Sequence, residues 1–295
     1  MFDIERFYAA SDLSDAIRHL EADPEAILIS GGTDVLIQIR EGKLAGRRLV
    51  SIHQLPGLAD IAIEPDGTIR IGGGATFSSI TNHPDLQSRI PILCDAVDQV
   101  GSPQIRNVGT VGGNLSNGVT SADSAPSLFA LNAVVELTGP QGVRRLPIAD
   151  YYAGPGKTVR EHSEILTAVR IATSNYEGYG GHYIKYGKRE AMEISTLGCA
   201  VCVKLTADKA QVEDVRIAFG VAAPIPTRCP ITEEASKGLP VDGALLETVS
   251  RGVLDEVHPR DSWRASKAFR LQLIQELSRR ALAQAITYAG GEIHA

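Results

Sequence analysis

Apolar and polar positions along the first part of the chain alternate in short blocks that switch between a helical and a strand period. Residues 11–22 place their apolar side chains on one face of a helix, which Asp23-Pro24 ends. The apolar run over 26–30 predicts a buried strand, 35–42 a helix, and 47–52 a second strand. Together these elements predict a small α/β unit over residues 1–55.

The middle of the chain repeats this alternation on a larger scale. It first predicts a hairpin over 61–76, with its turn at Pro65-Asp66-Gly67. Two helices are predicted next: one begins at Thr76 or Ser78 and stops near Pro84, and the other covers 91–100. A short helix and a strand pair over 127–152, with the turn at 139–142, and a strand over 164–171 complete this region. Within this region, residues 101–126 are rich in Gly, Ser, Thr and Asn, and little in them resembles a packed core.

The last third follows a polar stretch at 172–180, which we interpret as a linker between domains. Beyond it, three runs with strand character (181–188, 196–206 and 212–223) precede three helical segments (233–239, 243–257 and 266–290). The pattern predicts a three-stranded sheet backed by helices. The predicted domains are therefore 1–175, divided into subdomains 1–55 and 56–175, and 181–295.

Two glycine turns carry the most informative chemistry. The first, Ser30-Gly31-Gly32-Thr33-Asp34, joins a predicted strand to a predicted helix, and the second, Thr110-Val111-Gly112-Gly113-Asn114, is the centre of residues 101–126. A backbone without Cβ atoms can approach a ligand closely, and successive free N–H groups at a turn or helix start suit a phosphate. A single glycine pair is usually only a turn. Two of them, each beside a threonine, could hold one pyrophosphate from two sides, so both interpretations stay open on the pattern alone.

Composition narrows the class of protein. The 295 residues, 43% of them apolar and 22% charged, are enough for two or more globular domains. A net charge of −6 argues against nucleic acid as the main partner. No apolar run is long enough to span a membrane, and the first ten residues lack the apolar core of a secretory signal. Four cysteines without a regular framework indicate a reducing compartment, and we expect the cytoplasm.

Three other motifs invite a functional interpretation that their spacing does not support. Cys199 and Cys202 form a CxxC pattern inside an apolar strand, where residues three apart point to opposite faces, so we expect two buried thiols rather than a metal or redox pair. The segment 154–158, GPGKT, lacks the glycine that a phosphate-binding NTPase loop requires at Tyr151. The remaining candidates for metal ligands share no spacing, and we expect no metal; they are His53, His162, His182 and His258.

The glycine turns, together with the blocks that follow them, resemble the FAD-binding subunit of the xanthine dehydrogenase and molybdenum hydroxylase family. The blocks are Ser30–Asp34, Gln104-Ile105-Arg106-Asn107 before the second turn, Ala122-Asp123, Glu164-Ile165-Leu166, Lys185 with Arg189-Glu190-Ala191-Met192, and 259–266. They occur in the family's order and span essentially the whole chain. The resemblance implies an α+β fold with a two-part FAD-binding domain of the vanillyl-alcohol oxidase (PCMH) type and a smaller flavoprotein C-terminal domain.

The resemblance also implies which residues bind the cofactor. The first turn would wrap the pyrophosphate and ribityl chain of FAD, and the second would hold the pyrophosphate from the other side. Asp123 would bond a cofactor hydroxyl, Leu166 would pack near the adenine, and Lys185 would lie near the flavin. The residues so predicted to bind FAD, without a covalent link, are Leu28, Ile29, Ser30, Gly31, Gly32, Thr33, Asp34, Val35, Thr110, Val111, Gly112, Gly113, Asn114, Asp123, Ile165, Leu166 and Lys185.

A subunit rather than a complete enzyme is implied. Molybdopterin would belong to a large partner subunit and 2Fe–2S clusters to a small one, and electrons would pass from the clusters through FAD to NAD⁺, the expected acceptor, or to dioxygen. The flavin carries the chemistry, so no catalytic side chain is expected in this chain. Lys188, Arg189 and Glu190 are candidates for a loop that gates the acceptor; the alternative is a plain surface loop.

One departure from the resemblance and two alternative hypotheses remain. Some relatives hold an extra iron–sulfur cluster with grouped cysteines, and this sequence has no such group, so we expect no cluster. The competing hypothesis is a stand-alone flavin oxidoreductase of the vanillyl-alcohol oxidase type with its own substrate pocket, although the last third offers no obvious acid–base set for one. A weaker alternative is a scaffold that has lost its cofactor.

Overall fold

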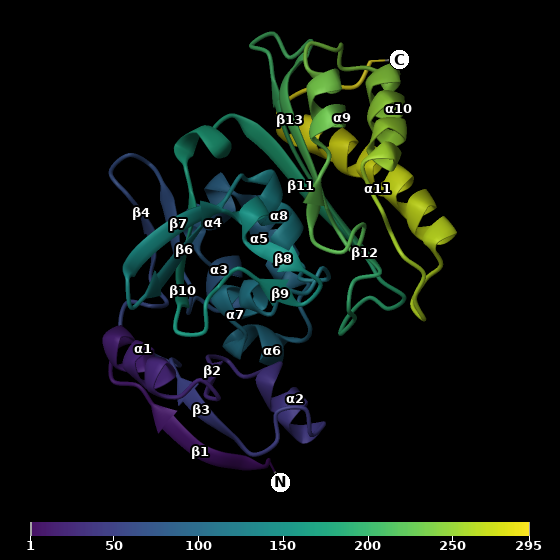
Figure 1. Ribbon diagram of the computed structural model, residues 1–295. Coiled ribbons are helices and arrows are strands. Elements are labelled where there is room, and N and C mark those ends of the chain that lie inside the picture. The colour runs from purple at the N-terminus through teal and green to yellow at the C-terminus, as the bar shows by residue number, and fades with distance from the viewer. Residues whose placement is uncertain (1, 295) are drawn as a thin grey trace.

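The computed structural model describes residues 2–294, which form an N-terminal subdomain at one end, a central sheet with helices, and a C-terminal sheet with its own helices at the other end (Figure 1). In the N-terminal subdomain, β1 (Ile4–Ala9), β3 (Arg47–Ser51) and β2 (Ile27–Ile29) pair in that order as a parallel sheet, with α1 (Leu13–Ala22) and α2 (Val35–Arg40) between them in sequence. The sequence pattern predicts no strand before residue 11, because β1 lies at the sheet edge and most of its residues are exposed.

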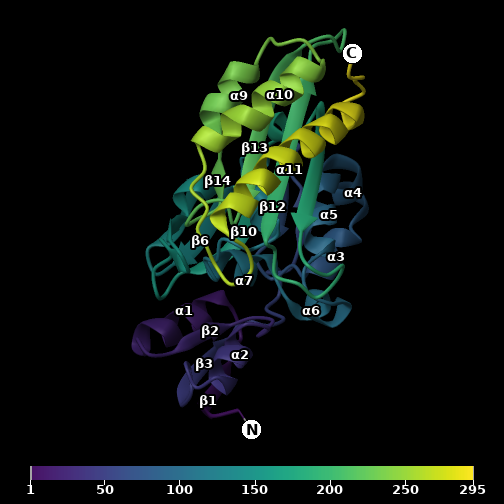
Figure 2. The same ribbon diagram turned by 90° about the vertical axis from the view of Figure 1, so that its right-hand side faces the viewer.

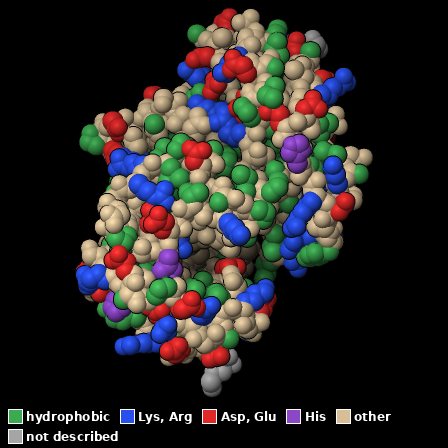
Figure 3. Space-filling model, in the orientation of Figure 1, with side chains coloured by type: hydrophobic (Ala, Val, Ile, Leu, Met, Phe, Trp, Pro, Cys, Tyr) green, Lys and Arg blue, Asp and Glu red, His purple; other side chains and the backbone are tan. Residues whose placement is uncertain are grey.

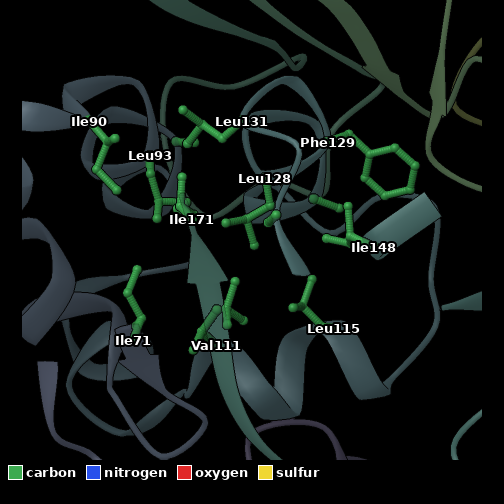
Figure 4. Packing of buried hydrophobic residues seen from close by; sticks show 14 of the residues in the cluster. Ile71, Ile90, Leu93, Val111, Leu115, Leu128, Phe129, Leu131, Ile148 and Ile171 are labelled. Atoms are coloured by element: carbon green, nitrogen blue, oxygen red, sulfur yellow. The ribbon is translucent and has the colours of Figure 1, made fainter. Parts of the chain in front are cut away.

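An antiparallel sheet forms the centre of the molecule. Its strands follow the order β4 (Ile61–Ile63), β5 (Ile69–Gly72), β10 (Ile165–Ile171), β6 (Val134–Gly139) and β7 (Gly142–Pro147). Helices α3 (Phe77–Thr81), α4 (Pro84–Arg89), α5 (Pro91–Asp98) and α8 (Ser124–Ala130) pack their apolar side chains against strand residues such as Ile71 and Ile171 (Figure 4). A small hairpin of β8 (Tyr152–Gly154) and β9 (Lys157–Thr158) follows β7.

Residues 101–126 are largely helical, where the sequence pattern indicates a polar loop. They form α6 (Pro103–Val108), α7 (Val111–Ser116) and the start of α8. Thr110 caps α7 by accepting the N–H of Gly113 on its side-chain oxygen. Val111 and Leu115 then bury their side chains in the central core (Figure 4). The sequence pattern does not predict α7, because a six-residue helix with Gly-Gly in its first turn has little helical propensity.

The C-terminal part is an antiparallel sheet in the order β11 (Tyr179–Tyr186), β12 (Leu197–Leu205), β13 (Val212–Gly220) and β14 (Thr227–Arg228), and α9 (Pro230–Ser236), α10 (Gly243–Gly252) and α11 (Lys267–Tyr288) cover one face (Figure 2). The sequence predicts three strands in this sheet, and within the described residues β14 is a fourth. A strand of two residues is too short to produce an alternation of apolar and polar positions in the sequence. β11 begins inside the stretch interpreted as a linker. None of the helices in residues 2–294 combines the length and the hydropathy that a membrane-spanning segment needs.

The C-terminal sheet lies between two hydrophobic cores and contributes side chains to both. Along β12, Cys199 belongs to the core formed with α10 and α11, whereas Cys202 belongs to the central core. The two thiols are free and buried on opposite faces, which confirms the prediction from the CxxC spacing. Because both faces of the sheet are packed, the C-terminal part cannot turn relative to the central part without exposing apolar surface.

Candidate functional site

The two glycine turns lie against each other in the structure. A Cβ atom on Gly31 would come within 1.8 Å of the carbonyl oxygen of Val108, just before the second turn. A Cβ atom on Gly112 would come within 2.6 Å of the carbonyl oxygen of Gly73, which follows β5. Gly31 and Gly112 are therefore required for contact between backbone segments of the protein itself, a role that the sequence pattern does not reveal.

A groove runs between the two turns and holds about 1010 Å³ of empty space, part of it open to solvent. Figure 3 shows this face of the molecule hollowed between the N-terminal subdomain and the part above it. Residues of both turns line the groove, and the hydroxyls of Ser30 and Thr110 lie 3.4 Å apart where the turns meet. An open groove lined by segments that are remote in sequence is a candidate ligand site.

The free backbone donors belong to the first turn. Within the described part of the chain, the N–H groups of residues 31–34 have no hydrogen-bond acceptor. Those of the second turn are engaged, since Gly112 donates to the carbonyl of Gly73 and Asn114 to the carbonyl of Thr110, both at 2.9 Å. The expectation of free donors in both turns is thus wrong for the second, whose N–H groups pair with the segment after β5 or start a capped helix. Four successive N–H groups in the first turn therefore remain available to an anion.

Two apolar patches line the groove, each continuous with a different hydrophobic core. The N-terminal patch consists of Leu28, Ile52 and Ile165, which pack with the core beneath α1. The central patch consists of Phe77 and Val100, which pack with the central core. Flat rings bind well on such patches, while a charged link between two rings would need the free N–H groups.

The lining of the groove leaves room for a ligand close to the backbone. A Cβ atom on Gly113 would meet only the hydroxyl oxygen of Thr110, at 3.1 Å, and would otherwise enter the groove. Among the described lining residues, only Asp34 and Arg160 carry a charge. The groove therefore suits a dinucleotide. Its free N–H groups and hydroxyls suit the diphosphate, and its two apolar patches suit the two rings. Fold and groove together define a dinucleotide-binding protein.

Most of the residues predicted to bind the cofactor line this groove. They are Leu28, Ser30, Gly31, Gly32, Thr33, Asp34, Val35, Thr110, Gly112, Gly113, Asn114, Ile165 and Leu166, from three segments far apart in the sequence. Ile29 and Val111 do not line it, because their side chains are buried in neighbouring cores. Asp123 and Lys185 also lie outside the lining, where they form a buried cluster.

The buried cluster joins the start of α8 to β11 and the segment before β12. Lys185 Nζ lies 2.7 Å from Asp123 Oδ2, Tyr183 donates to Asp123 Oδ1 at 3.0 Å, and Ser195 donates to the same oxygen. Burial raises the pKa of Asp123, and the charge of Lys185 opposes this rise. Burial also raises the pKa of Tyr183 well above its ordinary value of 10.0, so its phenol stays protonated.

The cluster adjoins the central patch of the groove. Lys185 also donates to the carbonyl of Gln99 at 2.8 Å, and Gln99 directly precedes Val100. Asp123 is fully engaged by Lys185, Tyr183 and Ser195, so in this structure it bonds protein donors rather than the groove.

The residues predicted to gate an acceptor lie on the connection between β11 and β12, outside the groove lining. Arg189 donates from Nε to Glu193 at 3.1 Å and from Nη2 to the carbonyl of Met192 at 2.6 Å. Lys188 Nζ lies 5.9 Å from the ring centre of the exposed Trp263, and Glu190 is exposed. Arg189 is thus engaged within its own loop, while Lys188 lies near the loop that carries Trp263.

Other lining residues have no signal, or a misleading one, in the sequence. They are Ile52, Gly73, Phe77, Val100, Asn117 and Arg160. The apolar ones read as ordinary core positions, and Arg160 lies in a polar turn. Gly73 is the exception, because the run Gly72-Gly73-Gly74 after a strand is itself a signal of close backbone approach.

Comparisons with known proteins identify the family. Residues 2–173 match the FAD binding domain in molybdopterin dehydrogenase, and residues 182–285 match the CO dehydrogenase flavoprotein C-terminal domain. The chain is 43% identical over 293 residues to the xanthine dehydrogenase FAD-binding subunit of Escherichia coli O157:H7, which covers 99% of this chain and 100% of that one. It is 31% identical over 274 residues to the nicotinate dehydrogenase FAD-subunit of Eubacterium barkeri, over 91% and 92% of the two chains.

The fold also matches a solved structure. Carbon monoxide dehydrogenase of Hydrogenophaga pseudoflava superposes with a TM-score of 0.92 over 98% of this chain and 99% of that chain, at 24% identity. The chain belongs to the family of FAD-binding subunits of molybdenum hydroxylases. The two-part FAD-binding fold with a flavoprotein C-terminal domain, and FAD as the cofactor, are confirmed.

Proposed function

We propose that this chain is the FAD-binding, electron-transfer subunit of a molybdenum hydroxylase of the xanthine dehydrogenase type. The observation that carries the proposal is the groove between the turn at Gly31-Gly32 and the turn at Gly112-Gly113, with free N–H groups at residues 31–34 and two apolar patches. The 43% identity to the E. coli subunit over its whole length supports the xanthine dehydrogenase type.

Each part of FAD has a suitable set of residues in the groove. The N–H groups of residues 31–34, with the hydroxyls of Ser30 and Thr110, would hold the diphosphate through charge-assisted hydrogen bonds, each worth about 1.5–3 kcal/mol. The N-terminal patch and Leu166 would hold the adenine, and the central patch would hold the isoalloxazine. Several such contacts together give tight binding without a covalent link.

The buried cluster places an ion pair beside the flavin end of the groove. Asp123 and the carbonyl of Gln99 hold the ammonium of Lys185 beside the central patch. Lys185 is the donor of this pair nearest the central patch, and Asp123 fixes its position there. When bound, the flavin supplies both one-electron and two-electron redox chemistry, and the chain binds it, orients it and sets the charge around it.

We propose a large molybdopterin subunit and a small 2Fe–2S subunit as partners, with electrons entering FAD from the clusters and leaving to NAD⁺. The relatives support this arrangement, because each is named as an FAD-binding subunit of a dehydrogenase. The four cysteines are free and buried, which fits a reducing cytoplasm.

The connection between β11 and β12 is proposed to contact the acceptor. Its exposed cations, Lys188 and Arg189, suit the phosphates of NAD⁺. In the assembled enzyme, R189A is expected to raise the KM for NAD⁺ with little change in kcat, whereas R251A, at an exposed position of α10, leaves both unchanged. An unchanged KM in R189A would remove the acceptor role from this loop while leaving the FAD assignment intact.

The proposed function is tested by purifying the tagged chain alone and together with the large and small subunits of its own genome. The chain alone is expected to show flavin absorption, to release FAD on denaturation, and to turn over no substrate. Co-expression is expected to recover all three subunits and substrate-dependent reduction of NAD⁺. A chain that purifies without flavin and takes none up would contradict the proposal, and turnover by the chain alone would favour a stand-alone oxidoreductase.

A further inference from the structure

We propose that Arg160 recognises the adenine ring of the bound dinucleotide and thereby sets the preference of the groove for FAD over a flavin mononucleotide. This inference rests on the proposed function, since it concerns the same groove. Among the described residues that line the groove, Arg160 is the only cation. The chain is acidic, with a net charge of −6, so we infer that the one arginine among the described lining residues contacts the nucleotide.

The guanidinium of Arg160 is held in place by its own turn. Its Nη1 donates to the carbonyl oxygens of Glu161, His162 and Glu164 at 3.0, 3.2 and 2.6 Å. The Nε and Nη2 groups donate to no acceptor within residues 2–294. One edge of the planar group is therefore fixed by the protein, and the other edge is available to a ligand without a further loss of side-chain entropy.

The position of the turn places this guanidinium at the N-terminal patch. Glu164, whose carbonyl accepts from Arg160, directly precedes Ile165, and Ile165 forms the patch with Leu28 and Ile52. This patch belongs to the core of the N-terminal subdomain, away from the central core that carries Phe77 and Val100.

A flat ring on the N-terminal patch would lie within reach of the free edge of the guanidinium. Arginine stacks on aromatic ring faces and donates to ring nitrogens, and a purine offers both an aromatic face and acceptor nitrogens. A mononucleotide flavin has only one ring system, which the central patch takes, so that ligand offers Arg160 no adenine to recognise. The discrimination between FAD and FMN therefore follows from the position of one side chain.

The test compares three ligands on the flavin-free chain: FAD, FMN and ADP, each titrated by fluorescence or calorimetry. The variants are R160Q, which removes the charge, and R160K, which keeps the charge but lacks the planar fork. The control is K157Q, because Lys157 is an exposed cation three residues before Arg160 that does not line the groove. R160Q is expected to weaken FAD and ADP by the same factor, about ten- to hundredfold, and to leave FMN within about twofold. R160K is expected to fall between R160Q and the parent chain.

Each other outcome has a defined meaning. FAD affinity that stays unchanged in R160Q overturns the inference and leaves the proposed function standing. An equal loss for FAD and FMN shows that Arg160 only supports the turn, which also overturns it. A parent chain that binds no FAD contradicts the proposed function itself. Should R160Q fail to fold by circular dichroism, R160K provides the same comparison, with a loss confined to FAD and ADP supporting the inference and no loss overturning it.

Discussion

The contact between the two glycine turns makes G31A the most informative single change. The added methyl group would lie 1.8 Å from the carbonyl oxygen and 2.6 Å from the carbonyl carbon of Val108, and 3.1 Å from the nitrogen of Gly109. All three atoms belong to the backbone, so no side chain can rotate to make room. The two turns must move apart by roughly 1 Å or deform, because close-packed interiors have no slack of that size.

The expected magnitude follows from this overlap. Forcing an extra methyl group into a packed site costs about 1–3 kcal/mol of the free energy of unfolding. In a domain of this size, each kcal/mol lowers the Tm by roughly 2–4 °C, so a fall of several degrees is expected in the flavin-free chain. Separating the donors at residues 31–34 from the second turn also removes at least one charge-assisted hydrogen bond to FAD, which corresponds to about a ten- to hundredfold loss of affinity.

Two matched variants separate packing from ligand contact. G113A faces the groove, where its methyl group would meet only the Thr110 hydroxyl, so it is expected to weaken FAD binding without lowering the Tm of the flavin-free chain. G243A adds a methyl group with no atom within 4 Å and is expected to change neither property. The assays are differential scanning calorimetry and FAD titration. A G31A chain with the Tm and FAD affinity of the parent would refute the reasoning.

Two further predictions concern ionisation. Arg144, which donates to Glu164 at 2.7 Å, holds the pKa of that carboxyl below its ordinary value of 4.5, so the ionised form stabilises the fold above that pH and this contribution is lost as the pH falls through the lowered pKa. E164Q should therefore have a lower Tm than the parent at pH 7, with a difference that shrinks below pH 4.5 in a series of thermal melts; a constant difference would contradict this. Burial raises the pKa of Cys94 and Cys202 to about 12, so thiol reagents at pH 8 should label these residues far more slowly in the native chain than in the denatured one, and their rapid native labelling would contradict the packing of the central core.

The sequence pattern predicts the parts of the fold that rest on periodicity. The apolar face of 11–22 and the apolar run over 196–206 indicate α1 and β12, because burial on one face or on both faces leaves a regular trace. The strand β14 leaves none, because it has two residues, and α7 leaves none, because glycines occupy its first turn. In both cases tertiary packing, not local preference, decides the structure.

The candidate site, like the fold, could be predicted from the sequence only in part. The turns at Gly31 and Gly112 can be found from the sequence, but the reason for these glycines cannot, because the Cβ atom of each would collide with a backbone segment that is remote in sequence. The pairing of Asp123 with Lys185 is likewise a contact between residues 62 positions apart. Arg160 lies in a polar turn that reads as surface, and only the folded chain brings it to the groove.

One consequence of the doubly packed C-terminal sheet concerns how the chain can be divided. A fragment that ends after residue 175 would bare the side of the central core that Tyr183, Ala200 and Cys202 normally cover, and the complementary fragment would bare those same side chains. Each half alone would expose apolar core residues to water, so the chain cannot be divided at the polar stretch 172–180 into two stable fragments. Rearrangements of this protein in the laboratory should therefore keep both halves on one polypeptide.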